Sequence, residues 1–229
     1  MANNIPTVGL IGGTGEEGRG LALRWAMAGA QVTLGSRTVE RAVDAAADVN
    51  RLLGASRVVA AQNRDAVANS QLVLLTVPYE HAETTLEAHR SDFQPGAVLI
   101  DITVPVVFEK GRARYAAPPE GSASEHLQTL LPDNVPLVAA FKTEPAHLML
   151  DPGVDLNCDT FVASDSVEAR RKVMDAITMI KGLRPIDAGR LDSARAIERM
   201  TVLLVGINRR YKVRTGRFRV LGLEQPGAN

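Results

Sequence analysis

Short apolar runs alternate with longer stretches of mixed polarity along most of the chain. The run at 71–77 is apolar on both faces, as a buried strand of a parallel sheet requires. We expect strands in the first half at 8–12, 31–35, 57–61, 71–77 and 97–102. Helices are expected between them at 21–28, 38–53 and 79–89. This alternation predicts a parallel sheet with helices on both faces.

The second half continues the same order after a glycine- and proline-bearing interruption at 110–121. Helices are expected at 122–131, 167–180 and 192–208, and strands at 136–141, 160–164 and 183–188. The last helix carries apolar residues at helical spacing, which we expect to pack into the core: Ile197, Met200, Leu203, Leu204 and Ile207. Residues 224–229 are expected to form a frayed tail. The predicted class is α/β: a Rossmann-type, doubly wound, mainly parallel sheet with a smaller C-terminal α/β elaboration.

Composition narrows the function classes. The 229 residues carry 26 Lys+Arg and 26 Asp+Glu, which argues against a globally basic nucleic-acid-binding protein. One cysteine, Cys158, excludes an internal disulfide framework and a cysteine-rich zinc site, and it fits a reducing, cytoplasmic compartment. Residues 1–6 lack the basic segment of a signal peptide, and no apolar run approaches about 18 residues, so we expect neither export nor a membrane span. No metal site is expected.

A glycine-rich hexamer follows the first expected strand and opens the first helix. Its sequence is Gly13-Thr14-Gly15-Glu16-Glu17-Gly18, a GxGxxG pattern in the context that dinucleotide-binding proteins require. Glycines let the backbone approach a pyrophosphate, which the amides at the helix N-terminus bind. The motif predicts a dinucleotide site. The carboxylates of Glu16 and Glu17 are expected to point away from the phosphates.

The end of the second strand selects the cofactor. An NAD site usually has Asp or Glu here for the ribose 2′-hydroxyl, but this chain has Gly35-Ser36-Arg37, with Arg41 one helical turn further on. Ser36 can donate a hydrogen bond, and the two guanidinium groups can pair with a 2′-phosphate. We therefore predict NADP(H).

Taken together, these motifs and several later ones resemble the NADPH-dependent reductases of the deazaflavin coenzyme F420. The segments that carry the resemblance span nearly the whole chain: 12–15, 20–24, 35–37, 76–81, 104–106, 143–146 and 182–189. The resemblance implies hydride transfer between the nicotinamide of NADPH and the deazaflavin of F420, the co-substrate. Such a reaction requires no catalytic side chain, because the cofactors carry the chemistry. It also implies a homodimer.

The resemblance assigns roles to individual residues. It places Thr14, Gly15, Glu16 and Glu17 at the pyrophosphate and Ser36, Arg37 and Arg41 at the 2′-phosphate. It implies that the path from adenosine to nicotinamide is lined by Val77, His81, Val104 and Ala146. Residues 1–148 would form the NADP-binding domain, and 149–229 would complete the acceptor pocket and supply dimer contacts.

Two residues depart from the family pattern. Lys142 and Glu144 replace a histidine and an apolar residue that face the second substrate in the family. On a strand, residues two apart point to the same face. One interpretation is a surface ion pair of little energetic value. The other is a changed acceptor pocket, in which Lys142 polarises a carbonyl or receives a proton and Glu144 orients a polar or cationic substrate.

Alternatives to F420 reduction therefore stay open at this point. The chain could reduce another acceptor, such as a flavin, quinone, imine or carbonyl compound, or could act as a non-catalytic NADPH sensor. Eight basic residues between 195 and 219 bear on the acceptor: Arg195, Arg199, Arg209, Arg210, Lys212, Arg214, Arg217 and Arg219. They could hold the anionic tail of F420, or they could form a solvated or dimer-contacting helix end.

Overall fold

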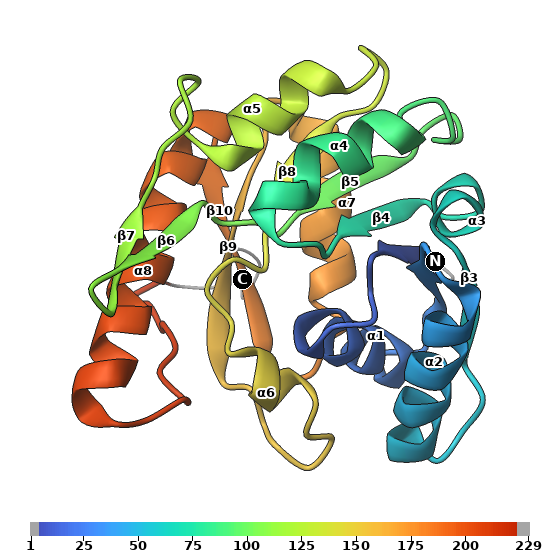
Figure 1. The fold of residues 1–229 in the computed structure, drawn as a ribbon. Coiled ribbons are helices and arrows are strands. Elements are labelled where there is room, and N and C mark those ends of the chain that lie inside the picture. The colour runs from blue at the N-terminus through green and yellow to red at the C-terminus, as the bar shows by residue number, and fades with distance from the viewer. Residues whose placement is uncertain (1–4, 224–229) are drawn as a thin grey trace, which may run out of the picture.

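The computed structural model describes residues 5–223, and the tail expected at 224–229 lies outside this range. Eight strands form one sheet in the order β10-β9-β8-β5-β4-β1-β2-β3 (Figure 1). Their bounds are β1 (Thr7–Ile11), β2 (Gln31–Ser36), β3 (Val58–Gln62), β4 (Leu72–Leu75), β5 (Val98–Asp101), β8 (Leu137–Ala139), β9 (Cys158–Ala163) and β10 (Leu183–Gly189). All neighbours are parallel except β8 and β9, which meet at Ala139 and Ala163. The expected fold class is confirmed.

Helices cover both faces of this sheet. One face carries α1 (Glu16–Met27), α2 (Val39–Leu53), α6 (Ala146–Met149) and α7 (Val167–Ile177). The other carries α3 (Asn63–Ala68), α4 (Tyr79–His89), α5 (Ala123–Leu130) and the start of α8 (Ala194–Tyr211). Strand β4 shows why both faces are apolar: Leu72 and Leu74 pack into the first core, whereas Val73 and Leu75 pack into the second. This is the two-faced burial that the apolar run predicted.

Capping residues in the sequence predict several helix ends correctly. Helix α4 has the bounds expected from the sequence, and Thr38 is the N-cap residue of α2. Gly54 ends α2 with a φ of 69°, the left-handed conformation that glycine adopts without strain. Ser122 caps α5 by accepting a hydrogen bond from the Glu125 amide at 3.1 Å.

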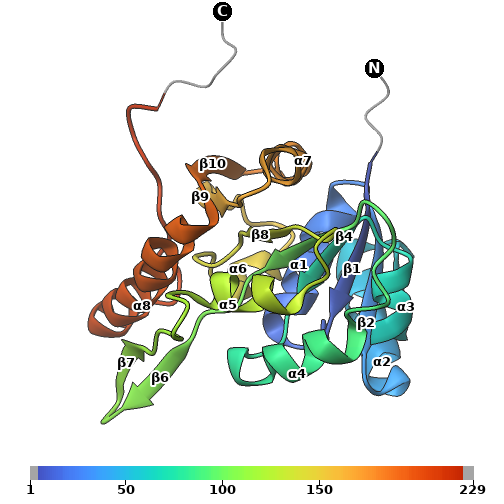
Figure 2. The same ribbon diagram turned by 90° about the horizontal axis from the view of Figure 1, so that it is seen from above.

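A hairpin occupies the region where the sequence pattern was interrupted. Strands β6 (Val106–Glu109) and β7 (Arg112–Tyr115) pair antiparallel and lie beside α8 (Figures 1 and 2). The two turn residues, Lys110 and Gly111, both have positive φ, as a two-residue hairpin turn requires. The sequence analysis missed this hairpin, because its strands are only four residues long and none of their residues is buried.

Helix α8 only partly meets the expectation of core packing. Ile197 and Leu204 are buried, but Leu203 is 57% exposed and Ile207 is 38% exposed. The prediction that the whole stripe packs into the core is therefore wrong for these two residues. They lie four residues apart and so share one outer face of the helix.

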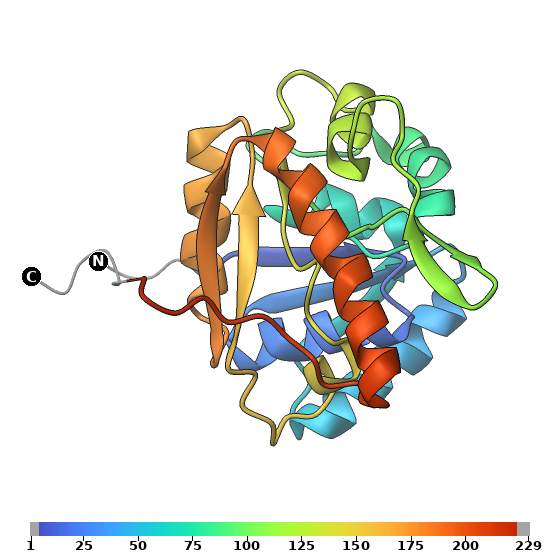
Figure 3. The same ribbon diagram turned by 90° about the vertical axis from the view of Figure 1, so that its left-hand side faces the viewer.

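The chain after α8 turns back and crosses β9 and β10 (Figure 3). The amide of Asp159 in β9 donates to the Phe218 carbonyl at 2.9 Å, and the amide of Val220 donates to the Asp159 carboxylate at 2.6 Å. Arg184 of β10 also pairs with Asp159, at 2.7 Å. This segment therefore forms a strap over β9 and β10.

No helix between residues 5 and 223 combines the length and the apolar character needed to cross a membrane. The single sheet passes without a break across residue 148, since β8 and β9 pair directly. The division into 1–148 and 149–229 stays a prediction.

Candidate functional site

The glycine-rich loop lies at the carboxyl ends of β1 and β2, where ligands of doubly wound sheets bind. Neighbouring elements hold it: the Gly13 amide donates to the Gly35 carbonyl at 3.0 Å, and the Gly12 amide donates to Asn63 Oδ1 at 3.1 Å. Helix α1 begins at Glu16 with Gly15 as its N-cap, and no side chain of the described residues caps it. Its first-turn amides are therefore open to an anion.

Two glycines of the loop suit a phosphate-binding site, which we call the phosphate cradle, each in a different way. A Cβ on Gly18 would lie 2.5 Å from the Cα of Gly13, so the loop closes onto α1 only with glycine there. A Cβ on Gly15 would meet nothing within 4 Å, so Gly15 faces open space. The loop is tight on its inner side and accessible on its outer side, as a bound pyrophosphate requires.

The residues expected at the 2′-phosphate lie beside this loop. Ser36 ends β2 and is buried, with its Oγ accepting a hydrogen bond from the Thr38 amide at 3.2 Å. Arg37 and Arg41 are exposed, and Arg41 lies in the first turn of α2. The assignment of these residues to NADP stays a prediction.

A cavity of about 420 Å³ continues from the loop along the carboxyl ends of the central strands, and we call it the loop cavity. It is lined by residues 15–18, 76–79 and 102–104 and by Lys142, Glu144, Ala146 and Thr201. Val77, Val104 and Ala146 line it, and their assignment to the path from adenosine to nicotinamide stays a prediction. His81 is not one of its lining residues; its ring is 62% exposed and lies 3.7 Å from Glu80.

A second cavity of about 240 Å³ adjoins the loop cavity, and we call it the helix cavity because α8 and the segment 213–216 form one wall. The two cavities share five residues, which we call the junction: Glu16, Lys142, Glu144, Ala146 and Thr201. Both residues that depart from the family pattern therefore lie at the junction.

Lys142 is not part of a surface ion pair. Strand β8 ends at Ala139, so Lys142 and Glu144 lie in the following loop rather than on a strand. The Lys142 side chain is 0% exposed, with Nζ 2.7 Å from Asp101 Oδ2 and 3.2 Å from Glu198 Oε1. Burial lowers the pKa of Lys142, but the two carboxylates outweigh it and raise the pKa overall.

The remaining atoms of this buried cluster are also hydrogen-bonded. We call Lys142, Asp101 and Glu198 the Lys142 cluster. Asp101 accepts hydrogen bonds from the amide and hydroxyl of Thr103 and from Ser124 Oγ. Glu198 accepts from the Tyr115 hydroxyl at 2.7 Å and from the amide of Ala123 at 3.0 Å. Because its ammonium group is held by these partners, Lys142 shapes the junction but does not offer a charge to a substrate.

Glu144 is in a different situation from its neighbour Lys142. Its Oε2 accepts a hydrogen bond from the Thr143 amide at 3.0 Å, while its Oε1 is buried and has no hydrogen-bond partner among the described residues. Burial raises the pKa of Glu144 to about 7, although Thr160 and Thr143 act in the opposite direction. The site therefore contains an acid that changes charge near neutral pH.

Glu17 and Glu16 also line the loop cavity, and the expectation that their carboxylates point away from the phosphates stays a prediction. Burial, followed by the negative charge of Glu144, raises the pKa of Glu17 to about 8. A protonated Glu17 can lie near a phosphate without charge repulsion. Glu16 is more exposed and lies 3.7 Å from Arg214.

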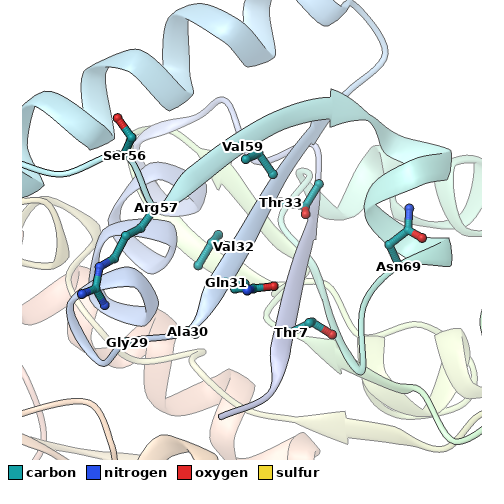
Figure 4. A pocket seen from close by; sticks show the side chains of 10 residues that line it. All are labelled: Thr7, Gly29, Ala30, Gln31, Val32, Thr33, Ser56, Arg57, Val59 and Asn69. Carbon is teal, nitrogen blue, oxygen red and sulfur yellow. The ribbon is translucent and has the colours of Figure 1, made fainter.

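A larger, open cavity of about 590 Å³ lies at the opposite end of the sheet (Figure 4). Thr7, Gln31 and Val59 line it at the amino ends of β1, β2 and β3. Ligands of parallel sheets bind at the carboxyl ends, so this cavity is not the dinucleotide site.

Sequence reasoning missed Asp101, Glu198 and Thr201. Thr201 Oγ1 donates to the Lys142 carbonyl at 2.7 Å and belongs to the junction. Asp101 closes an apolar strand, a position at the ligand edge of the sheet that could have marked it. Glu198 and Thr201 come from α8, far away in the chain, and carried no local signal.

Comparisons with known proteins agree with this geometry. Residues 7–105 match the profile of the family described as NADP oxidoreductase, coenzyme F420-dependent. The chain is 38% identical to the F420-dependent NADP reductase of Methanothermobacter thermautotrophicus, over 96% of this chain and 97% of that protein. It is 32% identical to the F420-dependent NADP reductase of Methanocaldococcus jannaschii, over 95% of this chain and 99% of that protein.

A solved structure shows the same fold. The crystal structure of a candidate F420-dependent NADP reductase from Arthrobacter sp. FB24 aligns with a TM-score of 0.79 at 23% identity, covering 94% of this chain and 99% of that one. Sequence similarity over nearly the full length of the two reductases then identifies the family. The chain belongs to the F420-dependent NADP reductases.

Proposed function

We propose that this protein is an oxidoreductase that transfers hydride between NADPH and coenzyme F420. The observation that carries the proposal is the 38% identity to the Methanothermobacter enzyme over 96% of the chain. The phosphate cradle supports the same conclusion, because the first-turn amides of α1 are open and Gly15 faces free space. NADP(H) would bind its pyrophosphate there and its 2′-phosphate at Ser36, Arg37 and Arg41.

The two adjoining cavities suit a reaction between two co-substrates. The nicotinamide would lie in the loop cavity and the deazaflavin in the helix cavity, with the junction between them. Direct hydride transfer needs the two reacting carbons at about 3–3.5 Å and an environment without water. The protein's part is therefore to position the rings, which requires no nucleophile or metal.

The C-terminal basic residues support an anionic co-substrate, but fewer of them are available than the sequence indicated. Arg195 pairs with Glu125 at 2.6 Å, and Arg199 lies 4.6 Å from the centre of the Tyr115 ring. Arg214 lines the helix cavity and is 76% exposed. We assign Arg214 to the anionic tail of F420.

We also propose that the protein forms a homodimer and acts in the cytoplasm. The outer face of α8 exposes Leu203, Ile207 and Tyr211, and the adjacent hairpin exposes Phe108 to 70%. A surface of this kind supports burial against a second copy. The cytoplasmic assignment rests on the single cysteine, Cys158, which is buried and unpaired.

The decisive test is anaerobic mixing of the purified protein with NADPH and oxidised F420, with free flavin as the control acceptor. We expect rapid loss of the deazaflavin absorbance with F420 and none with flavin. No loss of absorbance, with NADPH still bound, would overturn the proposal. If no acceptor were turned over, the result would indicate an NADPH sensor.

One observation favours a second candidate, reduction of a polar or cationic acceptor such as an imine. The junction has acidic side chains, Glu16 and Glu144, while the ammonium of Lys142 is held by its own cluster. A protonated imine would be attracted to this environment. Turnover of cyclic imines in the absence of F420 turnover would establish this alternative.

A further inference from the structure

Hydride transfer to an organic acceptor is only half of a reduction. When hydride adds to C5 of a deazaflavin, the electron pair moves to a ring nitrogen, which then takes up a proton. An imine nitrogen or a carbonyl oxygen has the same requirement. The protein must either supply this proton or admit water to a site that works best without it.

The junction is the place where such a proton donor would have to lie, because it borders both cavities. Three of its residues are titratable. The ammonium of Lys142 is held by Asp101 and Glu198, and the Glu16 side chain is 46% exposed. Glu144 alone of these three has a buried oxygen, Oε1, that makes no hydrogen bond to the described residues.

The charged and titratable groups that line the two cavities with Glu144, or act on it electrostatically, come from several elements. They are Glu16 and Glu17 of α1, Lys142 of its own loop, His147 of α6, Cys158 of β9 and Arg214 after α8. Burial raises the pKa of the Cys158 thiol to about 12, which leaves it neutral. Lys142 is paired with Asp101 and Glu198, and Arg214 is exposed. The negative charge of Glu144 raises the pKa of the acid Glu17, whereas Thr160 and Thr143 lower the pKa of Glu144 itself.

We propose that Glu144 supplies the proton that accompanies hydride transfer to the acceptor, and takes it back when the reaction runs in reverse. The proposal rests on the proposed function. In the reducing direction, the C4–H bond of NADPH breaks with both electrons and a C–H bond forms at C5 of the deazaflavin. The O–H bond of Glu144 breaks, its proton passes to N1 of the ring, and the carboxylate left behind regains a proton from solvent.

The opposite requirements of the two directions provide the test. Reduction of F420 needs protonated Glu144, so its rate should fall as the pH rises through about 7. Oxidation of reduced F420 by NADP⁺ needs the carboxylate, so its rate should rise through the same pH. In Glu144→Gln both rates should drop roughly 100-fold and both pH dependences should vanish, in line with general acid–base contributions of about 10²–10⁴.

A second measurement does not depend on turnover. Carboxyl ¹³C NMR of glutamate-labelled protein without substrates should show a signal that titrates near 7 and is absent from Glu144→Gln. Fluorescence titration should show NADPH binding to this variant, which confirms that it folds. Glu144→Asp keeps an acid at the site and should retain both pH dependences at a lower rate.

Glu168→Gln is the matched control. Glu168 is an exposed glutamate in the first turn of α7, and it lines neither cavity. Its variant should keep the wild-type rates and pH profiles.

The outcomes separate the two proposals. Wild-type rate and pH dependence in Glu144→Gln, or a Glu144 signal titrating at the ordinary glutamate pKa, would overturn the role of Glu144. A wild-type protein that turns over no F420 would overturn the proposed function, while the NMR titration would still decide whether Glu144 holds a proton at neutral pH.

Discussion

Arg37 is the residue on which the choice between NADP and NAD depends. In Arg37→Ala, the lost charge-assisted contact to the 2′-phosphate is worth about 1.5–3 kcal/mol, so NADP(H) affinity should fall roughly 10- to 100-fold. NAD affinity should change little, because NAD has no group for Arg37 to contact. Fluorescence titration with NADPH and NADH measures both.

Arg51→Ala is a suitable control for this change. Arg51 is an exposed arginine at the other end of α2, where it pairs with Asp48 at 2.6 Å. Its variant should bind both cofactors normally. An equal loss of affinity for NADPH and NADH in Arg37→Ala would show that Arg37 acts structurally.

Lys142 and Glu144 show how strongly the environment decides the role of a residue. Both were candidates for the acceptor pocket, and both lie at the junction. The Lys142 ammonium has two carboxylate partners, whereas one Glu144 oxygen has none among the described residues. We therefore expect Glu144, and not Lys142, to exchange a proton with a substrate.

At the scale of elements, the Lys142 cluster joins parts of the fold that meet nowhere along the sequence. It connects β5 through Asp101, α8 through Glu198, and the start of α5 and β7 through the partners of Glu198. Lys142→Met leaves two buried carboxylates without their cation and should destabilise the protein by about 3–5 kcal/mol. Urea unfolding followed by circular dichroism measures this loss.

The comparison for this variant is Lys181→Met. Lys181 is exposed in the turn after α7, and its replacement should change the stability by no more than about 0.5 kcal/mol. A loss below about 1 kcal/mol in Lys142→Met would mean that the cluster tolerates its missing cation, against the behaviour of buried ion pairs.

At the scale of the whole molecule, the outer face of α8 is the surface that we expect to join two copies. Leu203 lies on this face and is 57% exposed. Leu203→Glu would place a charge where apolar surface must be buried, and it should convert the dimer to a monomer in light scattering after size exclusion. Val43→Glu changes an apolar residue of similar exposure, 51% accessible on α2, and should leave the dimer intact.

A wild-type protein that is monomeric at micromolar concentration would contradict this prediction. A dimer that persists in Leu203→Glu would instead place the contact elsewhere on the surface. The hairpin residue Phe108, which is 70% exposed beside α8, belongs to the same surface.

The sequence alone determined the sheet and the dinucleotide loop. Buried strands such as β4 carry an apolar run on both faces, and helix ends such as Gly54 have residue types that local backbone geometry demands. The GxGxxG motif is likewise a local sequence pattern: a Cβ on Gly18 would collide with Gly13, only five residues away. Signals of this kind are contained in short windows and can be read without the fold.

The junction, by contrast, could not be predicted from the sequence, because it is formed by contacts between distant parts of the chain. Asp101, Lys142 and Glu198 lie on separate elements, and their attraction depends on burial and distance, which no short window contains. The sequence also could not show that one side of α8 is exposed, because an apolar stripe has the same pattern whether it faces a core or a second molecule. Whether Glu144 is free to exchange a proton depends on which partners its neighbours already have. Those partners are fixed only in the folded chain.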